Sequence, residues 1–280
     1  MTATPREVDI SYSLEGAFYR LGVTAWGDPK AQPVVCVHGL SRNGRDFDAL
    51  AAALQDRFYL ICPDVPGRGR SSWLPDPAMY HPGSYVQALS HLLAFIDRPV
   101  FWVGTSMGGI LGMLLAAAPG NPITRMVLND IGPFIPQAAI ARIQSYIGTL
   151  PQFADLNEAE AYFRSVHAPF GRLTDAQWQD MARHSTRRLA DGKLALHYDP
   201  GLTVPLLATT AAATDLWAVW KRIDLPLLTL RGAESDLLLP ETFTRMAGKS
   251  ALHTVAECGH APALMDAPTI GVIRAFLEAG

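Results

Sequence analysis

Short and almost continuously apolar runs alternate with segments of helical periodicity along most of the chain. The runs predict strands at residues 33–38, 58–63, 99–104, 125–130, 226–232 and 250–257. Strands that are buried on both faces are apolar nearly throughout, and helices between them are typical of a parallel sheet covered on both faces. Residues 9–16 and 19–27 alternate differently and predict an antiparallel entry to this sheet.

Residues 133–222 interrupt this rhythm, because they contain helix-like stretches and no convincing strand. The pattern of strands resumes at Leu225 and Pro226. We therefore expect a core domain made of residues 1–132 and 223–280, with a helical cap at 133–222 inserted between the sixth and seventh strands. Placed over the carboxyl ends of parallel strands, such a cap would cover the crevice where these sheets bind ligands.

Composition and charge narrow the classes of partner. The chain has 280 residues, is 49% hydrophobic and carries a net charge of −3, with its basic residues scattered. This pattern excludes a general nucleic-acid or anionic-membrane partner, and no apolar run is long enough to span a membrane. Cys36, Cys62 and Cys258 are too few and too far apart for a disulfide framework or a metal site, so we expect a cytoplasmic protein without bound metal.

The stretch GTSMGG at residues 104–109 predicts a nucleophile. A strand that ends at Gly104 and a helix that begins directly after Ser106 form a tight turn, which tolerates little side-chain bulk. Gly104 and Gly108 remove that bulk and leave the Ser106 hydroxyl near the first N–H groups of the helix. The glycines therefore present Ser106 as a nucleophilic serine.

A serine hydroxyl needs a base, and the base needs a carboxylate. Of the eight histidines, His260 follows the last predicted strand and is the predicted base. For the carboxylate we favour Asp236, which follows the next-to-last strand and gives the chain order serine, aspartate, histidine. Asp130, at the end of the strand after the nucleophile helix, is the alternative, and Glu234 would project differently from the loop of Asp236.

Two backbone N–H groups are expected to form an oxyanion hole. Met107 follows the nucleophile, and Leu40 lies in the loop after the strand at 33–38, where Gly39 allows the backbone to approach closely. Arg42, just past this loop, and Phe134, at the entrance to the cap, are candidate substrate contacts together with Gly39.

Five motifs in this order resemble the α/β-hydrolase superfamily, over essentially the whole chain except the insertion. They are HGL (38–40), DVPGRGRS (64–71), GTSMGG (104–109), ESD (234–236) and CGHAP (258–262). The resemblance implies a mostly parallel, eight-stranded sheet with helices on both faces, a helical cap and a serine nucleophile that requires no cofactor. Arg68 stands where histidine is frequent in the family, and we expect a structural role for it.

The resemblance predicts a serine esterase that acts through an acyl-enzyme on a small to medium, largely apolar ester, with water as the second substrate. A C–C bond hydrolase, a lactonase and a cofactor-free perhydrolase remain alternatives, although Ala261 stands where C–C hydrolases commonly carry tryptophan. A catalytically silent binding protein of the same fold is an alternative of another class. The sequence leaves open the ester, the oligomeric state and whether Asp130 takes the place of Asp236.

Overall fold

A computed structural model describes residues 4–279 and places eight strands in one sheet, in the order β1-β2-β4-β3-β5-β6-β12-β13. Their bounds are β1 (Arg6–Leu14), β2 (Ala17–Trp26), β3 (Gln32–Val37), β4 (Phe58–Pro63), β5 (Val100–Thr105), β6 (Ile123–Asn129), β12 (Leu227–Gly232) and β13 (Ser250–Val255). Strand β2 pairs antiparallel with β1 and β4, and every pair from β4 to β13 is parallel. The predicted eight-stranded, mostly parallel sheet with an antiparallel entry is confirmed.

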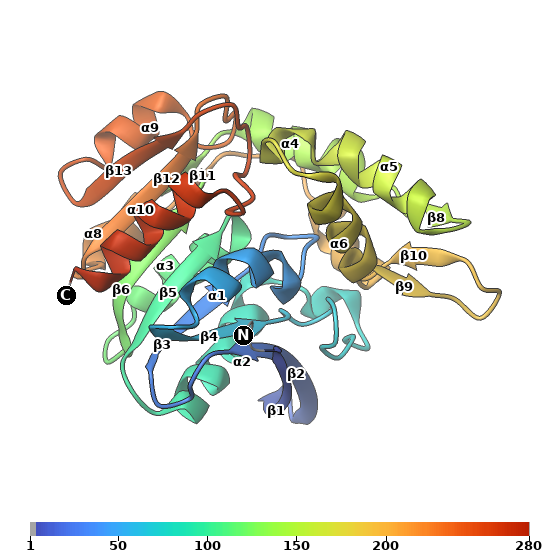
Figure 1. The fold of residues 1–280 in the computed structure, drawn as a ribbon, viewed down its shortest axis with the longest axis horizontal. Helices are drawn as coiled ribbons and strands as arrows, with labels where there is room; N and C mark the ends of the chain where they lie inside the picture. Colours follow the sequence, from blue (N-terminus) through green and yellow to red (C-terminus); the bar gives the residue numbers. More distant parts are fainter. Residues whose placement is uncertain (1–3, 280) are drawn as a thin grey trace.

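Helices cover both faces of this sheet (Figure 1). The core helices are α1 (Asp48–Leu54), α2 (Pro82–Ile96), α3 (Met107–Ala116), α9 (Pro240–Arg245) and α10 (Ala267–Glu278), with short 3₁₀ turns at η1 (Gly44–Phe47) and η2 (Pro77–Met79). Helices α1 and α10 contact each other and bury Leu50, Leu54, Ile273 and Leu277 against one face. Helices α2 and α3 pack on the other face.

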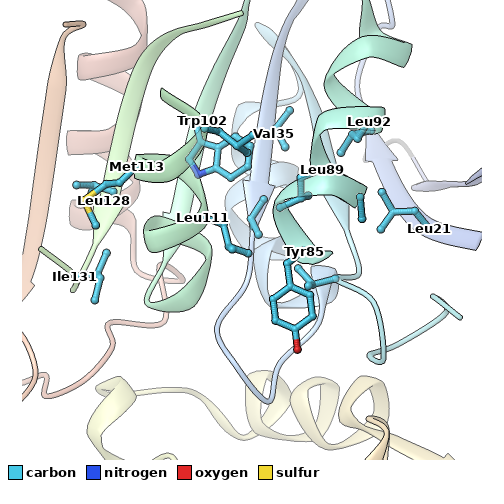
Figure 2. Close-up of a cluster of buried hydrophobic side chains, with 14 of the residues drawn as sticks. Leu21, Val35, Tyr85, Leu89, Leu92, Trp102, Leu111, Met113, Leu128 and Ile131 are labelled. Carbon is cyan, nitrogen blue, oxygen red and sulfur yellow. The ribbon is translucent and has the colours of Figure 1, made fainter. Parts of the chain in front are cut away.

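The larger hydrophobic core lies under α2 and α3. Figure 2 shows Leu89 of α2 and Leu111 of α3 beside Val35 and Trp102 of the sheet. The Trp102 side chain is fully buried, and its indole N–H donates to the Gly108 carbonyl at 3.1 Å. This hydrogen bond attaches the first turn of α3 to the sheet directly behind the loop that carries Ser106.

Most of the segment between β6 and β12 lies at one end of the sheet, whereas its last helix, Trp217–Arg222, contacts α3 of the core (Figure 1). It contains β7 (Phe134–Ile135), α4 (Gln137–Ile147), β8 (Gln152–Phe153), α5 (Leu156–Val166), η3 (Ala168–Phe170), α6 (Asp175–Ser185), β9 (Thr186–Arg188), β10 (Leu194–Leu196), η4 (Pro200–Leu202), α7 (Thr203–Ala208), β11 (Thr214–Asp215) and α8 (Trp217–Arg222). We call residues 133–222 the insertion. The helical periodicity of residues 141–148, 158–166, 175–190 and 215–223 predicts α4, α5, α6 and α8, whereas α7 was not predicted.

The prediction that the insertion has no strand is wrong. Strands β8, β10 and β9 form a three-stranded sheet, and β7 pairs with β11. Each strand has two or three residues, which is too short for an alternating pattern to show. The helical pattern of residues 175–190 in fact ends at Ser185, where the chain turns into β9. Within residues 4–279, no helix is long and apolar enough to cross a membrane.

Candidate active site

Ser106 lies on the tight turn between β5 and α3. Its backbone has φ = 51° and ψ = −116°, a conformation that is costly for a residue with a side chain. A Cβ at Gly104 would lie 2.5 Å from the Gly108 carbonyl oxygen, and a Cβ at Gly108 would overlap the Val37 carbonyl oxygen. The two glycines are therefore required by close backbone contacts, as the sequence indicated.

The structure brings His260 to Ser106. The hydroxyl oxygen of Ser106 lies 2.9 Å from His260 Nε2, and His260 Nδ1 lies 2.7 Å from a carboxylate oxygen of Asp130. Because a carboxylate only accepts hydrogen bonds, Nδ1–H donates to Asp130, which leaves Nε2 to accept the Ser106 proton. The three side chains form one continuous hydrogen-bonded line.

The structure contradicts the placement predicted for Asp236. Its carboxylate points outward into a two-hydrogen-bond ion pair with Arg142 of α4, and both side chains are exposed. Asp130 instead is fully buried, at the end of β6 and next to β12 in the sheet. The neighbour of Asp236, Ser235, is buried instead and donates to Asp130.

Asp130 is held in place from both of its oxygens. One oxygen accepts the Gly232 N–H at 2.8 Å, and the other accepts the Ser235 hydroxyl at 2.6 Å besides His260. The Ser235 oxygen itself accepts from the N–H groups of Leu237 and Leu238. The loop after β12 therefore contributes Ser235, rather than Asp236 or the exposed Glu234, to the site. The motif ESD marked the correct loop, but no sequence signal distinguished the role of its serine.

The predicted oxyanion loop lies beside Ser106. A Cβ built on Gly39 would be 3.7 Å from the Ser106 Cβ, so a substituent there would approach the nucleophile. No acceptor within residues 4–279 receives the Leu40 N–H. Met107 is the first residue of α3, and the first N–H groups of a helix have no acceptor within it. Both predicted donors thus lack an acceptor among the described residues, and their role as an oxyanion hole stays a prediction.

Two buried side chains fix this loop from behind. His38 Nε2 accepts the Val65 N–H at 2.9 Å, and Nδ1–H donates to the Gly39 carbonyl at 2.7 Å. The Arg68 side chain donates to the Leu40 carbonyl at 2.9 Å, lies 3.8 Å from the Met107 sulfur and is fully buried. Arg68 therefore contacts both residues of the predicted oxyanion hole. Its expected structural role is thus to hold these two residues.

A cavity opens at Ser106 between the core and the insertion. It encloses about 840 Å³ of empty space, its open mouth included. Its wall combines residues 39–42, Ser106 and residues 260–265 of the core with residues of α4, η3 and α6. The insertion therefore covers the site from above the carboxyl ends of the strands.

The three predicted substrate contacts differ in position. Gly39 and Arg42 line the cavity, whereas Phe134 does not and lies in β7, paired with Asp215. The Arg42 guanidinium donates to both oxygens of Asp46, at 2.9 and 2.6 Å, so its charge is already paired. His167, a histidine that the sequence did not single out, lines the cavity next to Arg42. Only the folded chain brings residue 167 to residue 42.

Comparisons with known proteins identify the family of this chain. Residues 34–275 match the model of the alpha/beta hydrolase family. A 3-hydroxybutyrate-oligomer hydrolase of Cupriavidus necator is 39% identical over 99% of both chains, and a pimeloyl-[acyl-carrier protein] methyl ester esterase of Vibrio cholerae is 28% identical over 85% of this chain and 91% of its own. The crystal structure of an alpha/beta hydrolase from Novosphingobium aromaticivorans superposes with a TM-score of 0.89 at 33% identity, over 99% of both chains. The chain belongs to the α/β hydrolase family.

Proposed function

We propose that the chain is a serine carboxylic-ester hydrolase and that its substrates are short oligomers of 3-hydroxybutyrate or closely similar hydroxyacid esters. The observation that carries the catalytic part is the hydrogen-bonded line from Ser106 through His260 to Asp130 in the wall of a cavity. The substrate class is supported by the full-length similarity to a 3-hydroxybutyrate-oligomer hydrolase. The expected ester is thus more polar than the largely apolar ester predicted from the sequence.

In the proposed mechanism, His260 Nε2 takes the Ser106 proton while Ser106 Oγ attacks the ester carbonyl carbon. The N–H groups of Leu40 and Met107 stabilise the oxyanion of the tetrahedral intermediate. The carbon–oxygen bond to the leaving alcohol then breaks, and the imidazolium returns the proton to that alcohol. Asp130 orients the imidazole and stabilises its charged form.

Water completes the proposed cycle. His260 takes a proton from the water, the resulting hydroxide attacks the acyl carbon, and Ser106 Oγ leaves with the proton that His260 returns. The products are one carboxylic acid and one alcohol, and for a hydroxybutyrate dimer both products are 3-hydroxybutyrate. No cofactor enters this scheme. The insertion, residues 133–222, acts as a cap that closes the substrate cavity.

Hydrolysis of the 3-hydroxybutyrate dimer and trimer by the unaltered protein and by Ser106→Ala tests the proposal. We expect turnover that falls by at least ~10⁴-fold in the variant, since the nucleophile is removed. Ser90→Ala is a matched control, because Ser90 is exposed on α2, and we expect it to retain activity. A folded protein that releases no monomer from the oligomers would contradict the substrate class, and equal turnover by Ser106→Ala would contradict the mechanism.

A further inference from the structure

His167 is a polar side chain in an otherwise mostly apolar part of the cavity wall. Its ring stacks between Phe163 and Phe170, with centroid distances of 5.7 and 4.4 Å and interplanar angles of 11° and 21°. The residue is 8% exposed, and its Nε2 lies 3.3 Å from Nη1 of Arg42. Stacking against the two phenylalanine rings fixes the plane of the imidazole, and the contact with Arg42 fixes how the ring is turned within that plane.

The contact with Arg42 determines the tautomer of His167. A guanidinium has only donors, so His167 Nε2 must be the acceptor and Nδ1 must carry the proton. Burial, with a smaller contribution from the Arg42 charge, holds the pKa of His167 well below its usual value, so the ring stays neutral. Within residues 4–279, no acceptor receives the His167 Nδ1–H. This nitrogen does not belong to the fully buried polar atoms that lack a hydrogen-bond partner, so it is not completely buried.

Arg42 itself is a poor candidate for direct contact with a substrate anion. Its Nε and Nη2 both donate to Asp46, and Nη1 donates to His167. The guanidinium also lies over the Phe163 ring, 5.6 Å from its centroid. With these contacts made, the effect of Arg42 on a substrate would pass through His167, because a cation at Nε2 strengthens the Nδ1–H as a donor.

The surroundings of His167 make an unpaired donor important. The neighbouring wall includes Val166, Pro169 and Met181, which offer no polar partner to an oxygen of the substrate, and the hydroxyl-bearing residues Ser41 and Tyr146. A purely apolar wall discriminates weakly against a substrate that merely gains or loses a hydroxyl. A donor that is left unpaired by the wrong substrate discriminates more strongly, because the enclosed N–H loses its hydrogen bond to water.

We propose that the His167 Nδ1–H binds a substrate oxygen other than the scissile carbonyl and thereby selects esters that carry this oxygen over esters that lack it. This inference rests on the proposed function and names the group that would give it specificity. The oxygen belongs either to the 3-hydroxyl of the acyl part or to the carboxylate of the alcohol part. Both offer the same chemistry, an acceptor oxygen a few bonds from the scissile ester.

The test compares two substrates that differ in one hydroxyl, p-nitrophenyl 3-hydroxybutyrate and p-nitrophenyl butyrate. The measured quantity is the ratio of their kcat/KM values in the unaltered protein and in His167→Phe, which keeps an aromatic ring between Phe163 and Phe170. We expect this ratio to favour the hydroxylated ester and to fall by about tenfold in the variant, the effect of losing one hydrogen bond. Met181→Leu changes the same wall without removing a donor and should keep the ratio.

The 3-hydroxybutyrate dimer and its methyl ester distinguish the two sources of the oxygen. If the carboxylate is the acceptor, His167→Phe lowers kcat/KM for the dimer about tenfold more than for the methyl ester, and the p-nitrophenyl ratio stays constant. If the hydroxyl is the acceptor, the p-nitrophenyl ratio changes and the dimer and its methyl ester respond alike. A variant that lowers all four substrates equally overturns the proposal, because His167 then only supports the fold.

Product inhibition provides a readout that needs no variant. If the hydroxyl is the acceptor, we expect 3-hydroxybutyrate to inhibit the unaltered protein at least about fivefold more strongly than butyrate, and equal inhibition would contradict this form of the proposal. The outcome is separable from the proposed function. Loss of all ester turnover in the unaltered protein contradicts the proposed function, whereas turnover without oxygen-dependent selectivity contradicts only the role of His167.

Discussion

His38 links the geometry of the oxyanion loop to the stability of the protein in acid. The side chain is fully buried between Gly39 and Val65, and both ring nitrogens are hydrogen-bonded. Burial lowers the pKa of His38 from 6.5 to about 3, and the nearby charges of Arg68 and Arg42 act in the same direction. The folded state therefore keeps this imidazole neutral over a pH range in which the unfolded chain protonates it.

The sign and size of the effect follow from this difference in pKa. A base whose pKa is lower in the folded state binds fewer protons when folded, so stability is lost as the pH falls from about 6.5 towards 3. A pH of 5 lies 1.5 units below the pKa of 6.5 that His38 has in the unfolded chain. This difference corresponds to a loss of about 2 kcal/mol in the free energy of unfolding. Protonation would also prevent Nε2 from accepting the Val65 N–H.

Urea unfolding of the unaltered protein and of His38→Gln at pH 7.5 and pH 5.0 measures this contribution. Glutamine can accept from the Val65 N–H and does not titrate. We expect the unaltered protein to lose about 2 kcal/mol more than the variant between the two pH values. Equal losses would refute the reasoning.

The contributions of the other buried titrating groups to stability in acid cancel when the two proteins are compared. Burial lowers the pKa values of His184 and His197, which destabilises the protein in acid, and raises the pKa of Asp64 to about 6, which acts in the opposite direction between pH 4 and 6. Both proteins carry these groups, so only the difference between the two losses reports on His38.

Two further changes test the turn at Ser106 and the support of the oxyanion loop. Gly108→Ala places a Cβ against the Val37 carbonyl, and we expect a loss of about 1–3 kcal/mol in the free energy of unfolding, measured by urea titration; unchanged stability would show that the turn relaxes freely. Arg68→Gln removes the donor to the Leu40 carbonyl, and we expect kcat to fall about 10- to 100-fold with a smaller change in KM, while Arg68→Lys restores part of the loss. An increase in KM alone would place Arg68 in substrate binding rather than in the positioning of the oxyanion loop.

The sheet and the nucleophile turn could be predicted because their signals are local. The parallel strands other than the edge strand β13 are largely buried on both faces, so their apolar runs appear directly in the sequence. The predicted bounds lie within two residues of the observed ones. Gly104 is required by a contact within the turn, and Gly108 is required by a contact with the end of the neighbouring strand β3. The short strands of the insertion could not be predicted, because two or three residues carry no period.

The carboxylate could not be chosen from the sequence because the choice depends on packing between distant loops. Both Asp130 and Asp236 follow strands whose carboxyl ends meet at the same edge of the sheet. The two carboxylates differ in their partners. Asp130 accepts hydrogen bonds from Gly232 and Ser235, whereas Asp236 points outward and pairs with Arg142. His167 is a similar case, since its neighbour Arg42 is 125 residues away in the chain.

The most direct test of the account is steady-state hydrolysis of p-nitrophenyl butyrate by Asp130→Asn and Asp236→Asn under identical conditions. The two substitutions are chemically the same, and both replace a carboxylate on a loop at the carboxyl end of the sheet. We expect Asp130→Asn to lower kcat by about 10³- to 10⁴-fold, because the imidazole of His260 loses the carboxylate that orients it, and Asp236→Asn to lower it by less than about tenfold. A large loss in Asp236→Asn together with an active Asp130→Asn would contradict the proposed line from Ser106 through His260 to Asp130.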